Sequence, residues 1–264
     1  MRLLNRSPRP IFWWANCARA ALLLVMFAVG FAPAPAAAAG TADDDMTIAL
    51  NLAAMLRASR AIVSAEQTRI DDPELGDKGL SGQVVLDRAI AQFRQATGID
   101  AAALDPASRQ GRLLRAMQAS ITEVVDANQP TINAKGTGFK AFIPSTFGRL
   151  VSEAFARDAK GEAEVKVTAP PELIRNRRAR PDAWEAQVIR DKLLVADWPR
   201  GQAFSDSVRV GERDAFRVMV PEYYAASCLS CHGEPKGEMD KTGYPKEGSK
   251  VDELGGVISI TLFH

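Results

Sequence analysis

The chain has 264 residues, of which 47% are hydrophobic and 25% charged, a composition that fits a globular protein and excludes a disordered one. Its formal net charge is +1. Residues 1–40 contain four arginines and no acidic residue, so the remainder has 29 basic and 32 acidic side chains and a net charge of −3. A body this close to neutral excludes the electrostatic attraction that nucleic-acid binding needs.

The first 39 residues have the pattern of a signal peptide. Four arginines and no acidic residue accompany an apolar run at 20–32, and the small residues 36–38 offer an A-x-A cleavage site. We therefore expect residues 1–39 to be removed on export to the periplasm. An uncleaved membrane anchor is the alternative, because residues 11–32 are long enough to span a bilayer, although the charge of Arg19 interrupts them.

Four helices are expected in the helical region, residues 40–160. Apolar spacing, capping residues, glycines and prolines predict them at 46–70, 83–97, 105–129 and 144–159. The third is expected to have Asp105 as its N-cap and Pro106 at its first position. Residues 63–71 resemble residues 125–133, which predicts two helical hairpins of similar build, although alanine-rich helices also produce such similarity by coincidence.

From residue 161 onward the pattern changes to short alternating runs. They predict strands at 163–167, 205–210, 215–220 and 256–262, with one helix at 182–194. Antiparallel strands with a helix on one face would make an α+β fold, in which the helical region and residues 161–264 need not be separate domains.

The motif Cys-Leu-Ser-Cys-His at residues 228–232 contains two of the three cysteines, and the third, Cys17, would leave with the signal peptide. Two thiols separated by two residues can each add to a vinyl group of one haem, and the following histidine can coordinate the iron. The sequence therefore predicts one covalent haem c, attached through Cys228 and Cys231, with His232 as axial ligand. Helix-terminating residues at 233–237 place this motif in a loop ahead of a strand.

Three other readings of these cysteines remain open at this point. A structural zinc ion uses the same residue types but needs four ligands, and no second Cys or His cluster is present. A dithiol redox pair normally starts a helix in a thioredoxin-like setting, which the surrounding pattern lacks. A disulfide across two residues would close only a very small loop.

Three blocks of residues resemble the exported c-type haem-binding family with a PAS-like fold, the Tll-type cyanobacterial haem proteins that were formerly a domain of unknown function. The blocks are Arg175-Asn176 with Pro181-Asp182 and Trp184-Glu185, then Ser227 to Gly233, and then Tyr244 to Gly248 leading to Asp252 to Ile260. The match covers about the last hundred residues, and residues 138–144 match only loosely. Arg177 and Gly255 depart from the family, which often has proline and arginine there. The resemblance implies that haem lies against an antiparallel PAS-like sheet, an arrangement associated with sensing.

Arg175 and Tyr244 are further candidates for haem binding. Arg175 belongs to the densest basic cluster after the signal peptide, at residues 175–180, and an arginine fork suits a haem propionate, although a solvated loop explains such a cluster equally well. The aromatic residues that could border the haem, or only fill the core, are Trp184, Tyr223, Tyr224 and Tyr244.

The sixth ligand of the iron separates the functions that we consider. The candidates are Met46, Met55, Met117, Met219, Met239 and His264, among which the sequence makes no choice. A vacant or labile position favours a periplasmic sensor of redox state or of a diatomic ligand, acting through a partner protein, and a strong ligand favours a one-electron carrier. A peroxidase-like enzyme is a third reading, supported by neither a second histidine nor an acid–base pair near the motif.

Overall fold

Helices occupy the first part of the computed structural model, which describes residues 42–264. Their bounds are α1 (Ala42–Ala65), α2 (Gln67–Ile70), α3 (Gly82–Thr97), α4 (Arg109–Ala127), α5 (Gln129–Ile132) and α6 (Pro144–Asp158). All four expected helices are present, and α3 ends at Gly98, whose φ of 72° is the left-handed conformation that glycine adopts readily. The expected signal peptide, its cleavage site and Cys17 lie outside the described residues.

The predicted start of the third long helix is wrong by three residues. Ser108, not Asp105, is the N-cap of α4, and its Oγ accepts a hydrogen bond from the Gly111 amide at 3.0 Å. The Asp105 carboxylate instead accepts from the amide of Ala107, which makes a turn before the helix. That turn folds back over Gly111, where an added Cβ would lie 2.0 Å from the Asp105 carbonyl oxygen.

The two segments that resemble each other in sequence also share their local structure. In each, a long helix ends and a single helical turn follows, α2 after α1 and α5 after α4. Ile70 and Ile132 close these turns at equivalent positions, and both are 1% exposed. The two similar segments therefore share a buried isoleucine and an interruption between a long helix and a single helical turn.

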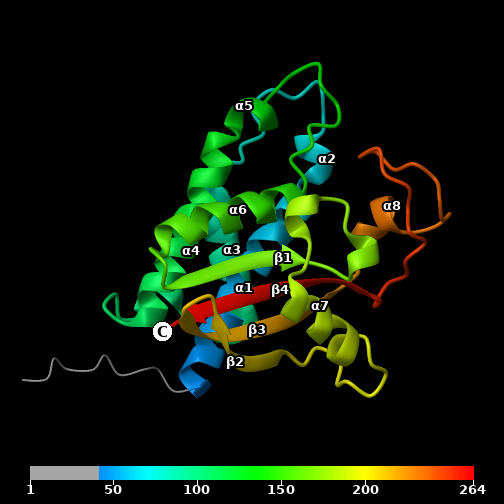
Figure 1. Ribbon diagram of the computed structural model, residues 1–264. Coiled ribbons are helices and arrows are strands. Elements are labelled where there is room, and N and C mark those ends of the chain that lie inside the picture. Colours follow the sequence, from blue (N-terminus) through cyan, green and yellow to red (C-terminus); the bar gives the residue numbers. More distant parts are fainter. Residues whose placement is uncertain (1–41) are drawn as a thin grey trace, which may run out of the picture. The chain divides into compact units, whose positions relative to one another are not determined.

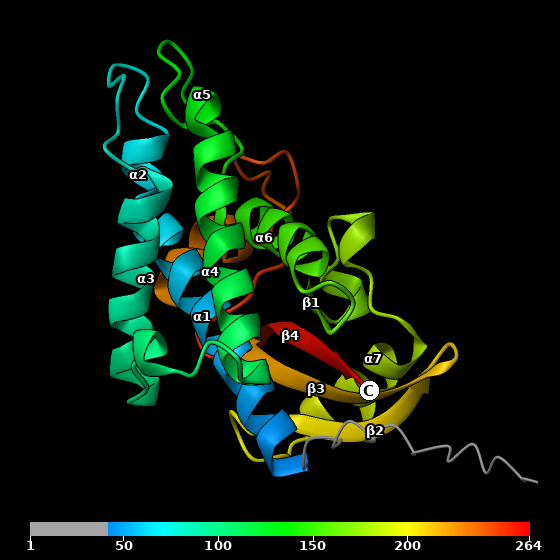
Figure 2. The same ribbon diagram turned by 90° about the vertical axis from the view of Figure 1, so that its left-hand side faces the viewer.

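Four antiparallel strands form one sheet, as the α+β pattern predicts. They are β1 (Ala163–Thr168), β2 (Phe204–Val210), β3 (Arg213–Tyr223) and β4 (Leu254–Phe263), in the order β1-β4-β3-β2. Figures 1 and 2 show the long helices on one face of this sheet and the short helix α7 (Ala183–Val188) on the other. A π-helical turn, Ile189–Leu193, continues α7 and completes the helix expected at 182–194.

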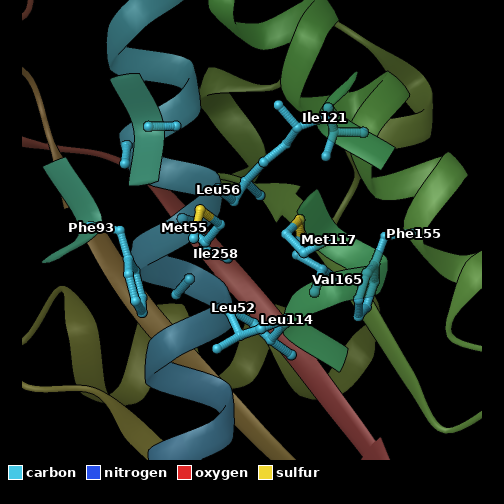
Figure 3. Close-up of a cluster of buried hydrophobic side chains, with 14 of the residues drawn as sticks. Leu52, Met55, Leu56, Phe93, Leu114, Met117, Ile121, Phe155, Val165 and Ile258 are labelled. Carbon is cyan, nitrogen blue, oxygen red and sulfur yellow. The ribbon is translucent and has the colours of Figure 1, made fainter. Parts of the chain in front are cut away.

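One apolar core joins the helices to the sheet. Helix α1 packs against β3 and β4, and α6 packs against β1. Figure 3 shows side chains of α1, α3, α4 and α6 meeting Val165 of β1 and Ile258 of β4. Residues 44–65 of α1 are long and apolar enough to cross a membrane, but 61% of their 18-residue apolar window is buried inside the protein.

An ion-pair cluster also ties α1 to the sheet. Glu222 on β3 accepts hydrogen bonds from Arg57, at 3.0 Å, and from Arg60, and its side chain is 14% exposed. Burial alone would raise the pKa of Glu222, but the two arginine charges and their hydrogen bonds outweigh burial and lower it. The carboxylate is therefore charged at neutral pH.

We predict that Glu222→Gln lowers the free energy of unfolding by about 2 kcal/mol at pH 7, because the partly buried Arg60 and the more exposed Arg57 lose their anion. The lowered pKa means that this contribution is present above the pKa of an unfolded glutamate, about 4.3, and is lost as the pH falls below it. Urea denaturation at pH 7 and at pH 3 measures the difference. Glu212→Gln, in the exposed β2–β3 turn, is the control, and an equal loss at both pH values would contradict the ion-pair explanation.

Candidate functional site

The motif lies in the connection between the neighbouring strands β3 and β4, residues 224–253. This is the expected place, ahead of a strand, but the motif itself is helical: Cys228 ends a 3-10 turn and residues 229–232 form the short helix α8 (Figure 1). The turn stops at Gly233, whose amide donates to the Leu229 carbonyl at 2.9 Å. A Cβ on Gly233 would lie 2.7 Å from that same oxygen, so this ending requires glycine.

Both motif cysteines are free thiols and both are partly exposed. A separation of three residues on a helical turn places Cys228 and Cys231 on one side of that turn. A single group lying against this side can therefore reach both sulfur atoms.

His232 is oriented by two neighbours within the same connection. Its Nδ1 lies 2.9 Å from a carboxylate oxygen of Glu247 and 3.5 Å from the hydroxyl of Tyr224. The Tyr224 and His232 rings lie with centroids 5.0 Å apart and their planes inclined by 32°. A carboxylate at Nδ1 fixes the proton on that nitrogen, so Nε2 keeps the lone pair that can bind a metal.

The ring of Tyr224 in turn packs against the backbone of Gly255. An added Cβ on Gly255 would lie 2.6 Å from the Tyr224 ring, so no larger residue fits while the ring is in this position. Tyr224 itself is 6% exposed, and burial raises the pKa of its hydroxyl, which stays protonated at neutral pH. Gly255 departs from the resembled family, in which arginine is frequent at this position. Here the absence of a side chain leaves room for Tyr224, which contacts His232.

Arg175 is the centre of the polar contacts around the motif. Its guanidinium donates to Glu247 at 2.8 Å, to Asp240 at 2.6 Å and to the backbone carbonyl of Cys231 at 2.9 Å. The Tyr244 hydroxyl donates to the Arg175 carbonyl at 3.0 Å, and Tyr244 as a whole is 44% exposed. The structure therefore brings both predicted residues beside the motif, where Arg175 binds protein groups, and their contact with a haem stays a prediction.

Asp240 and Glu247 are both held as anions. Burial would raise the pKa of each carboxyl group, but hydrogen bonds outweigh burial and lower it. Asp240 accepts them from Thr242, Arg175 and the Tyr244 amide, and Glu247 accepts them from Arg175 and His232. The Asp240 side chain is 0% exposed, so Arg175 is the cation that compensates a completely buried charge. Neither acid was predicted: Glu247 lay within a block of the resemblance without a role, and no sequence signal marks Asp240.

The candidates for a sixth ligand occupy different parts of the protein. Met55, Met117 and Met219 are 0% exposed within the apolar clusters, and Met46 packs against the main cluster. His264 binds Asp45 at 3.0 Å, at the end of β4 far from α8 (Figure 1). Met239, which is 60% exposed, is the candidate that lies in the same connection as the motif.

The other aromatic and basic candidates take part in separate contacts. The Trp184 ring lies 4.3 Å from the guanidinium carbon of Arg217, and the Tyr223 ring lies 3.9 Å from that of Arg200. The remaining arginines of the basic cluster, which are exposed, are Arg177, Arg178 and Arg180. Within residues 44–264, no three His, Cys, Asp or Glu side chains gather as a metal-binding group.

Comparison with known proteins gives one match. The family model described as Tll0287-like (Tll0287) matches residues 52–262, which run from α1 to β4 and include the motif. No curated protein and no solved structure matches the chain.

We predict that Arg175→Met lowers the free energy of unfolding by about 3 kcal/mol, because the buried Asp240 carboxylate loses its cation. Adding Asp240→Asn to the same chain should recover part of this loss, since the uncompensated charge is then absent. Chemical denaturation at neutral pH measures both. Arg177→Met, in the same segment but exposed, should change stability by less than about 0.5 kcal/mol; a similar loss there would show that the segment, not the ion pair, is sensitive.

Proposed function

The chain belongs to the Tll0287-like family, a haem-binding, cytochrome-like family, and we propose that it is a periplasmic protein carrying one haem c. The observation that carries the proposal is the hydrogen bond between Glu247 and Nδ1 of His232, beside two free thiols on one helical turn. In proteins that use histidine as a metal ligand, the second ring nitrogen commonly bonds a carboxylate in this way. The signal-peptide pattern of residues 1–39 supports the proposed location.

The donor set fits this cofactor in three respects. Cys228 and Cys231 would hold it by thioether bonds, and Nε2 of His232 would bind its iron. The negative charge of Glu247 makes the imidazole a stronger donor and keeps the ring from rotating. The connection between β3 and β4 leaves the sulfur atoms partly exposed, which gives a porphyrin access to them.

For its role we propose a sensor of redox state or of a diatomic ligand, which passes the signal to a partner protein. A haem at this site would supply one-electron chemistry and an iron coordination position for a small gas. Burial of Met55, Met117 and Met219 in packed apolar clusters keeps them from serving as ligands without repacking, which supports a labile sixth position. The four-stranded sheet with helices on its faces is compatible with the PAS-like arrangement that we propose for the fold.

A one-electron carrier is the second candidate, and Met239 is the observation that favours it. Its thioether is exposed and belongs to the connection that carries the motif. A methionine bound as sixth ligand would raise the reduction potential and exclude added gases.

The attachment is tested by changing both sulfur atoms. We predict that the protein, produced in a host competent for cytochrome maturation, has the mass of the polypeptide plus one haem after denaturation and is coloured. Cys228→Ser with Cys231→Ser should give the mass of the bare polypeptide, because no thioether can form. Ser230→Ala, between the two cysteines, is the control and should keep the haem. A colourless wild-type protein under these conditions would refute the proposal.

Carbon monoxide separates the two roles. For the sensor we predict that the reduced protein binds carbon monoxide rapidly, with a shift of its absorption bands, and that Met239→Leu leaves the spectrum without carbon monoxide unchanged. A carrier would instead show a six-coordinate low-spin spectrum that carbon monoxide does not alter, and Met239→Leu would convert it into a form that binds the gas. Met46→Leu, in the helical core, serves as the matched methionine control.

A further inference from the structure

A polar cavity of about 190 Å³ lies on the face of the sheet that also carries α7. It is lined by Glu164, Lys166, Asp182, Glu185, Arg217, Ser259 and Thr261. None of the residues that line the cavity belongs to the motif or to the connection between β3 and β4.

Four charged side chains of the lining form a network of ion pairs whose charges sum to zero. Nη2 of Arg217 donates to Asp182 at 2.8 Å and to Glu185 at 3.1 Å, and Lys166 donates to Glu185 at 2.7 Å. The Arg217 side chain is 8% exposed, with the Trp184 ring across its guanidinium. Two cations therefore balance two carboxylates, and the guanidinium is held rigidly in place.

The floor of the cavity offers hydrogen-bond donors that this network does not use. These donors are hydroxyl groups of β4 among the residues that line the cavity. Ser259 and Thr261, 3% and 7% exposed, lie two residues apart on β4 and so present their hydroxyls on the same face as Arg217. The hydroxyls can donate to the acceptor oxygens of an occupant, and the positive charge of the neighbouring Arg217 guanidinium favours a carboxylate at that place.

Another part of the lining carries a negative charge, which favours a positive group on an occupant. Glu164 lies on β1 directly opposite Thr261 of β4, is exposed, and forms no ion pair with any residue that the structure describes. Asp182, the other exposed carboxylate of the lining, is already paired with Arg217. A positive group on the occupant would compensate Glu164 without disturbing the balanced network.

From this arrangement we propose that the cavity binds a small zwitterion of the free amino-acid type, its carboxylate at Arg217, Ser259 and Thr261 and its ammonium group at Glu164. The size supports this class, since pockets for drug-sized ligands have about 300 Å³ or more and one water occupies about 30 Å³ of liquid. Its lining shares no residue with the proposed haem site, so it would give the protein a second chemical input.

The test uses the full exported chain, with its haem when the maturation host attaches one, and calorimetric titration with each standard amino acid at millimolar concentration. At least one is expected to bind. Its analogues without the amine or without the carboxylate, propionate and ethylamine in the case of L-alanine, should bind at least about tenfold more weakly. Thr261→Val is nearly isosteric and should raise the dissociation constant about tenfold, since one hydroxyl bond is lost. Glu164→Gln should reduce the preference for alanine over propionate.

Ser207→Ala, on exposed β2, is the matched control and should bind like the wild type. The haem absorption and melting temperature of every variant establish that the fold is intact, which separates failure of this site from failure of haem attachment. Absence of binding by every amino acid, or binding that Thr261→Val leaves unchanged, would overturn the proposed site. Equal binding of propionate and L-alanine would overturn the zwitterionic class.

Discussion

The position of His232 depends on the charge balance at Arg175. Residues 233–253 contain no helix and no strand of the sheet, and their backbone pairing is confined to a short turn in which Met239 and Pro245 form an isolated antiparallel bridge. A guanidinium that binds Asp240, Glu247 and the Cys231 carbonyl at once holds the middle of this segment against the motif. The amide of Ser249, which donates to the His232 carbonyl at 2.8 Å, adds a backbone contact from the same segment. Ion pairs here supplement the limited backbone pairing of the segment.

The rest of the fold gives this segment a rigid base. The connection leaves from β3 and returns to β4, the two strands on which α1 packs. Glu222, bound to Arg57 and Arg60 of α1, precedes by two residues the tyrosine that contacts His232. Lys241, within the connection, binds Asp71 after α2 at 3.0 Å, so the helical region also supports the site from the other side. Contacts from the helical region to β3, β4 and the connection thus hold the motif in its position.

The sequence predicted the parts of this protein that depend on local pattern. Helices and strands follow apolar spacing, and the cysteine–histidine motif is read directly, so both were placed within a few residues. The start of α4 was misplaced because Asp105 and Ser108 are both good capping residues, and only the packing of the preceding turn over Gly111 selects the second. Such a choice depends on contacts that sequence spacing does not contain.

Long-range partners escaped sequence reasoning for the same reason. Arg175 and Glu247 are separated by 72 positions, and no periodicity links them. Arg175 was predicted as a haem-binding residue because arginine suits carboxylates, and the carboxylates that it binds in the structure belong to the protein. The order of the strands could not be read either, because β4 follows β3 in the chain yet lies between β3 and β1.

That placement has a consequence for how the protein matures. β1 has no other partner in the sheet than β4, and β4 follows the motif in the chain. During synthesis or passage through a membrane from the amino end, the cysteines therefore emerge while the middle of the sheet is still missing. With the covalent attachment that we propose, an enzyme that forms the thioether bonds would meet Cys228 and Cys231 on an open chain, and the final strand would complete the sheet afterwards.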